Sequence, residues 1–244
     1  MTTAEGWTAA VRDRLAPGRL VPLGSAADGA WITERAARGV LGPVAAAVRG
    51  VVPGELRIGP DREREAGRER AAQPGTGPEP GTGSEPGTGS EPETGSEPGA
   101  LRVSASFAVV AGRPLPERVD ALRTALLAAA EDGLGLVVAA VDLRVTDLLD
   151  AEPEPAPEPA APPPGRTSPA TDDPVALTAL GVPGVAGVTD ALGPPVRRGP
   201  DGVRVELAVT AGVRPLDVAR AVRTAVTAAH PEEAAVTVVV SELR

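Results

Sequence analysis

The chain has 244 residues, of which 24 are basic and 33 acidic, so that its net charge is −9. It contains no cysteine, which excludes disulfide frameworks and thiolate metal sites. No apolar run approaches the roughly 20 residues that a membrane span requires, and the N-terminus lacks the basic and apolar pattern of a signal peptide. We therefore expect a soluble, cytoplasmic protein of one or two domains.

The start of the chain predicts a short helix followed by an extended arm. Residues 5–16 place Trp7, Val11 and Leu15 on one helical stripe, which favours an anchor onto the body of the protein. Residues 19–24, with the sequence RLVPLG, are expected to be extended.

A first folded module is predicted to begin with a helix over residues 30–50. Pro43 is expected to kink this helix, because proline removes a backbone hydrogen bond and clashes with the preceding turn. A Val-Pro-Gly turn then leads into a strand at 52–58. The apolar stripe predicted for the helix consists of Ile32, Ala36, Val40, Val44 and Val48.

The rest of the chain is organised around a strand–helix–strand unit that occurs twice. Residues 101–109 and 203–209 alternate between apolar and other residues, which is typical of a strand with one buried face. Each strand is followed by Arg-Pro-Leu and a helical pattern, and proline suits the first turn of a helix. The predicted helical stripes are Leu115, Val119, Leu122 and Leu126, and then Val218, Val222, Val226 and Ala229. The closing strands are 136–145 and 236–243, and their buried faces are left unassigned.

Sequence identity between the two helices favours an internal duplication. Residues 121–129 and 221–229 are identical at six of nine positions, within equivalent apolar spacing. A shorter helix at 174–180 and a second Val-Pro-Gly turn at 182–188 precede the second unit. We therefore predict an α+β fold with two repeated modules of the order helix–strand–strand–helix–strand. Each would have a three-stranded, mainly antiparallel sheet covered by helices.

Two acidic segments separate these parts. Residues 60–99 and 150–173 are rich in Pro, Gly, Ser and Glu, and such sequences bury too little apolar area to order themselves. Each of the two carries a net charge of about −5, which argues against nucleic acid as a partner. The predicted organisation is an N-terminal helix and arm at 1–25, a first module at 26–149 with an insert at 60–99, a linker at 150–173, and a second module at 174–244.

The sequence offers no catalytic, cofactor-binding or metal-ligating set, and we expect a protein that is not an enzyme. The one histidine, His230, falls at a helix end, where a cation favours the helix dipole. The acidic pairs 131–132 and 232–233 are interpreted as solvated turns. Gly133–Gly135 precedes a strand instead of following one, and Pro183 within Gly181–Gly184 removes an amide that a phosphate-binding loop would present.

Several short motifs stand out beside the order of elements: WITERAA at 31–37, VPGELRI at 52–58, VPGVAGV at 182–188 and the strand and helix that follow, to 226. Together with that order, they resemble the alkaline shock protein family of bacterial envelope stress response proteins. Lysine, asparagine and tyrosine are absent, which hints at a high-G+C, actinobacterial source.

The resemblance implies a non-enzymatic α+β scaffold without cofactors, held at the inner face of the membrane through a partner. The implied partners are a membrane-anchored envelope protein, related family members or a second copy of the chain. The alternative is a small-ligand- or nucleic-acid-binding regulatory module.

Overall fold

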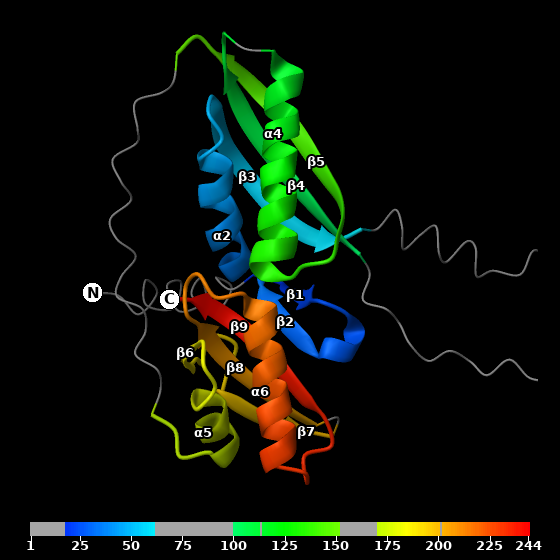
Figure 1. Cartoon of the computed structure of the whole chain (residues 1–244), viewed down its shortest axis with the longest axis vertical. Helices are drawn as coiled ribbons and strands as arrows, with labels where there is room; N and C mark the ends of the chain where they lie inside the picture. The colour runs from blue at the N-terminus through cyan, green and yellow to red at the C-terminus, as the bar shows by residue number, and fades with distance from the viewer. Residues whose placement is uncertain (1–17, 62–99, 113, 152–169, 201) are drawn as a thin grey trace, which may run out of the picture.

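The computed structural model describes residues 18–61, 100–112, 114–151, 170–200 and 202–244. The helix predicted at 5–16, most of the insert at 60–99 and most of the linker at 150–173 lie outside the described residues. The described chain is an α+β protein with one three-stranded sheet, one six-stranded sheet and helices on them (Figure 1).

The three-stranded sheet is mixed instead of mainly antiparallel. Its strands, in spatial order, are β3 (Val51–Pro60), β4 (Leu101–Val110) and β5 (Val138–Leu149). The β3–β4 pair is antiparallel and the β4–β5 pair is parallel. Helices α2 (Glu34–Ala46) and α4 (Leu115–Ala128) pack on this part of the chain, and a π-helical turn, η2 (Ala129–Leu134), continues α4. The alternation in β4 correctly predicted its buried residues, which are Leu101, Val103, Ala105, Phe107 and Val109.

The second sheet has six strands, so the prediction of three was wrong. In spatial order they are β1 (Leu20–Leu23), β2 (Ala30–Thr33), β9 (Val236–Leu243), β8 (Gly202–Val209) and β6 (Val185–Val188), with β7 (Val196–Gly199) paired to β8. The strands that the sequence did not predict are β1, β2 and β7. Helices α5 (Pro174–Leu180) and α6 (Pro215–Ala229) belong to this half, and the bounds of α5 and β9 are those predicted from sequence.

The helix predicted over 30–50 begins four residues late, because its first residues form β2. This strand pairs in parallel with β9, where Ile32 lies opposite Val240, and both are completely buried. Thr33 then caps α2, since its Oγ1 accepts a hydrogen bond from the Ala36 amide at 3.2 Å. The buried residues of α2 are Ala36, Ala37, Leu41 and Ala45, so the predicted stripe is confirmed at Ala36, whereas Val40 and Val48 are only partly buried.

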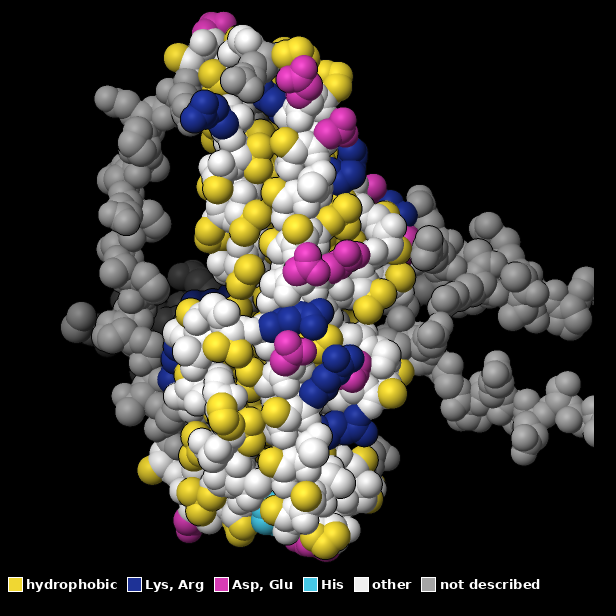
Figure 2. All heavy atoms as spheres, in the orientation of Figure 1, with side chains coloured by type: hydrophobic (Ala, Val, Ile, Leu, Met, Phe, Trp, Pro, Cys, Tyr) yellow, Lys and Arg dark blue, Asp and Glu magenta, His cyan; other side chains and the backbone are white. Residues whose placement is uncertain are grey.

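The two sheets share one hydrophobic core. The Gly24 amide donates to the Gly135 carbonyl at 2.8 Å, and a Cβ on Gly135 would lie 2.4 Å from Cβ of Leu216, so this position requires glycine. Arg214 of the second half donates to the Glu131 carbonyl of η2 at 2.9 Å. Figure 2 shows charged side chains gathered across this junction. The two halves therefore pack as one body.

Candidate interaction surface

His230 is the C-cap residue of α6, as its position in the sequence predicts. Its amide donates to the Val226 carbonyl at 2.8 Å. Its ring lies between two helices, with Nε2 at 3.0 Å from Oγ1 of Thr178 on α5 and Nδ1 at 3.4 Å from Glu232. These contacts tie α5 to the end of α6, which is a structural role.

The acidic pairs 131–132 and 232–233 are interpreted from the sequence as solvated turns, and one of these residues, Glu233, instead takes part in an ion-pair cluster. Arg198 donates to Glu233 at 2.8 Å and to Asp173 at 2.7 Å, so the three side chains form an ion-pair cluster. Asp173 is also the N-cap of α5, and the Arg198 guanidinium lowers the pKa of its carboxyl. Glu131 and Asp132 are exposed as predicted.

The glycine-containing segments serve as turns between elements. Gly135 ends η2 at a φ of 90°, and Gly181 ends α5. At Gly184 a Cβ would lie 2.8 Å from Val218, so the Val-Pro-Gly turn packs tightly on α6. Within the described ranges, no group of three or more His, Cys, Asp or Glu side chains is placed to hold a metal ion.

The structure contains a buried polar network around Glu206 that the sequence did not predict. The alternation in β8 predicts that Glu206 faces solvent, yet its side chain is 0% exposed, because the chain between β6 and β7 folds over this face. The carboxylate accepts hydrogen bonds from Oγ1 of Thr189 at 2.9 Å and from the Leu192 amide at 3.1 Å. Ser241 joins the network through Thr189. Because these groups are enclosed, the network holds a loop on the sheet and offers no reaction site.

A buried arginine on α4 is also missed by sequence reasoning. Nη1 of Arg118 donates to the Gly50 carbonyl at 2.8 Å and to the Val110 carbonyl, which joins the start of β3 to the end of β4. A Cβ on Gly50 would lie 2.3 Å from the same nitrogen, so glycine makes room for the guanidinium. The one available signal is the position of Arg118 one residue before the apolar stripe residue Val119.

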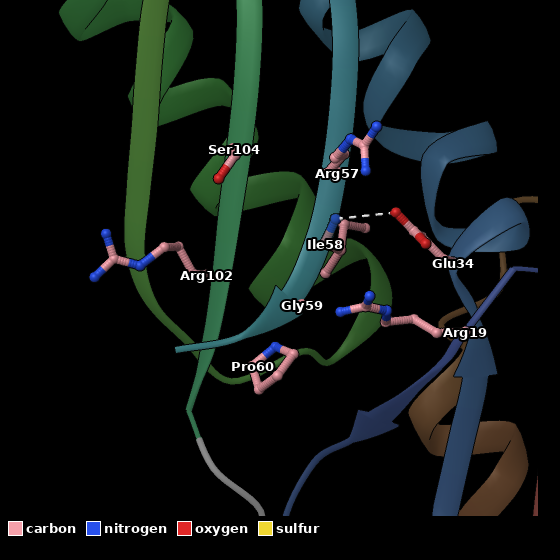
Figure 3. Close-up of a pocket in the computed structure, with 8 residues that line it drawn as sticks. All are labelled: Arg19, Glu34, Arg57, Ile58, Gly59, Pro60, Arg102 and Ser104. Atoms are coloured by element: carbon pink, nitrogen blue, oxygen red, sulfur yellow. Dashed lines mark hydrogen bonds between the residues drawn. The ribbon is translucent and has the colours of Figure 1, made fainter. Parts of the chain in front are cut away.

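A pocket of about 430 Å³ lies at the end of β3, on the face of the sheet away from α4 (Figure 3). Arg19 and Glu34 reach into it from the β1 and α2 side, and the Ile58 amide donates to Glu34 at 3.3 Å. Arg102 points from this pocket toward β5, where it binds Asp142 at 2.6 Å. The basic side chains that line the pocket therefore do not converge on one point.

Among the described edge strands, β5 is the longest that has one side without a partner strand. This strand has 12 residues and pairs only with β4 among the described strands, at one side of the three-stranded sheet (Figure 1). Its side chains remain partly or largely exposed, with Leu148 at 69%. Such an edge offers a row of backbone donors and acceptors to another strand.

Strand β9 shows what the corresponding edge looks like when it is covered. It follows α6 and pairs in parallel with the central strand β8, as β5 follows α4 and pairs in parallel with β4. On its other side β9 pairs with β2, and Val238, Val239 and Val240 are completely buried. When the two ladders are matched at the irregularity that follows Phe107 in β4 and Leu207 in β8, the corresponding residues of β5 are Leu143, Arg144 and Val145, none of which is buried.

No family model, curated protein or solved structure matches the chain. In the part of the chain that the structure describes, no helix has both the length and the apolar character needed to cross a membrane.

Proposed function

We propose that the protein is a non-enzymatic scaffold that binds a protein partner by strand addition to β5. The observation that carries this proposal is the contrast between the two matching strands. Strand β2 covers the edge of β9 at Val238–Val240, whereas none of the described strands covers the outer edge of β5, whose apolar residues are at most partly buried. Completing the sheet would satisfy the backbone groups of the edge and remove apolar area from water.

The proposal includes an internal duplication. Two units, α2-β3-β4-α4-β5 and α5-β6-β8-α6-β9, have the same order, and in each the central strand has an antiparallel and a parallel neighbour. The identity between residues 121–129 and 221–229 supports the same interpretation. On the resemblance to alkaline shock proteins, the partner is a membrane-anchored envelope protein, a related family member or a second copy of the chain, and the role is in envelope stress.

A photo-crosslinking amino acid at residue 148 tests this proposal in extracts of the source cells. Leu148 suits the probe because it is exposed and lies on β5, and Leu177 on α5 is a matched control with 53% exposure. We expect protein adducts from position 148 and few from position 177. An equal yield of adducts from both positions, or none from either, would refute a protein-binding role for β5.

The alternative function, binding of a small anion, is supported by Arg19 at the pocket. This arginine forms no ion pair within the described residues, and its Nη1 would lie 3.0 Å from a Cβ on Gly59. Titration calorimetry with pyrophosphate, on the natural chain and on Arg19→Ala, tests the alternative. Binding that the substitution abolishes would favour it over the scaffold.

A further inference from the structure

We infer that the partner of β5 is β5 of a second copy of this chain, in an antiparallel pair centred on Leu143. This inference rests on the proposed function and specifies the partner. A two-fold axis perpendicular to the sheet brings two identical edges together in antiparallel orientation. The result is one continuous six-stranded sheet made from the two three-stranded sheets.

The charges on β5 select the register. Centring on Leu143 places Asp142 opposite Arg144 of the second copy, and Arg144 opposite the second Asp142. A shift of the centre to Asp142 would oppose two carboxylates, and a shift to Arg144 would oppose two guanidinium groups. The strand is therefore complementary to itself in this register and repulsive in its neighbours.

The apolar side of the strand agrees with the same register. Val141 lies opposite Val145 of the second copy, and the two Leu143 side chains lie opposite each other. All three residues belong to the partly buried set packed against the hydrophobic core. Direct cross-strand pairs of this kind stabilise antiparallel sheets, and here they extend the core across the interface.

The geometry of β5 is suitable over this stretch. Its register with β4 runs without a shift from Ala140 to Val145, and the irregularities lie on either side. Asp142 is 53% exposed and accepts a hydrogen bond from Arg102 at 2.6 Å, which holds the carboxylate on the polar face of the sheet. The charged pairs and the apolar pairs thus occupy opposite faces of the new sheet.

Charge reversal on the full chain, followed by sedimentation velocity, tests the pairing. We expect the natural chain to dimerise at micromolar concentration, since one strand edge is smaller than a standard interface. Asp142→Arg alone, or Arg144→Asp alone, opposes like charges at both pairs and should raise the dissociation constant by roughly tenfold or more. The double variant Asp142→Arg/Arg144→Asp should dimerise again, and so should an equimolar mixture of the two single variants.

Asp147→Arg is the matched control, because it makes the same change of charge on the same strand outside the regular stretch Ala140–Val145, and it should leave the dissociation constant within about threefold. Thermal unfolding of each variant checks that it is folded. A natural chain that stays monomeric at about 200 µM would overturn the inference, as would single variants that dimerise as tightly as Asp147→Arg. If the chain is monomeric and the probe at 148 still captures another protein, self-pairing fails and strand addition survives. If neither occurs, both fail.

Discussion

The ion pair between Asp28 and Arg220 should stabilise the fold in a pH-dependent way. Asp28 ends the short 3-10 helix η1 (Ala26–Asp28) between β1 and β2, and Arg220 lies on α6. The guanidinium donates to the two carboxylate oxygens at 2.7 and 3.1 Å, and the Ser25 amide donates at 2.7 Å. These contacts attach the β1–β2 hairpin to the helix that covers the six-stranded sheet.

The expected magnitude follows from the carboxyl group. The hydrogen bond from Arg220, with further help from Ser25, lowers the pKa of Asp28 from 3.8 to about 2. Such a change corresponds to about 2 kcal/mol of unfolding free energy. Because half of the Arg220 side chain is in solvent, screening reduces the expected contribution to about 1 kcal/mol. For a chain of this size, that is a fall of about 2–4 °C in melting temperature.

The assay compares Asp28→Asn with the natural chain by thermal unfolding from pH 7 to pH 2. Since folding lowers this pKa, the stabilisation is complete above about pH 4 and is lost as the pH falls through about 2. The difference between the two proteins should therefore shrink over that window. Asp217→Asn is the control, because Asp217 is exposed and pairs with Arg214 at 3.3 Å on the same helix. A difference that is constant with pH, or equal in both variants, would refute the reasoning.

Two further substitutions test the buried polar groups. Glu206→Gln should cost about 1–3 kcal/mol in urea unfolding, because an amide has one acceptor oxygen in place of two charged ones; no loss would mean that the network adds nothing to stability. Arg118→Met keeps the buried methylenes but leaves the Gly50 and Val110 carbonyls without their donor, and should cost about 2–3 kcal/mol. Arg123, on the same helix, has a side chain that is 42% exposed, so Arg123→Met should cost less than about 0.5 kcal/mol, and equal losses would contradict the role given to Arg118.

Local patterns in the sequence predict most of the central elements. Alternation located β4 and β8, and helical spacing located α4 and α6, because one face of each element lies against the core. The bounds of α5 agree with the helix predicted at 174–180. These signals are local and need no knowledge of the rest of the fold.

The missed features depend on contacts between distant parts of the chain. Residues 30–33 have a pattern that suits a helix, and their pairing with β1 and β9 makes them a strand. The Thr33 hydroxyl bonds to the Ser241 carbonyl, 208 residues away, so no local pattern could reveal it. The alternation in β8 alone places Glu206 on the exposed face, and the loop that contains Thr189 covers it in the folded chain. The open edge of β5 is also a property of the sheet order, which the sequence does not display.

Hydrogen–deuterium exchange at increasing protein concentration tests most directly whether β5 binds another strand. At about 1 µM, the outward amides of Val138–Leu149 should exchange fast, and at about 200 µM they should become protected. The amides of Val238–Val240 lie between strands β8 and β2 and should be protected at both concentrations. The Asp142→Arg variant should show fast exchange in β5 throughout. Exchange in β5 that does not change with concentration would contradict a self-pairing edge, and slow exchange at every concentration would show that the edge is already covered within one chain.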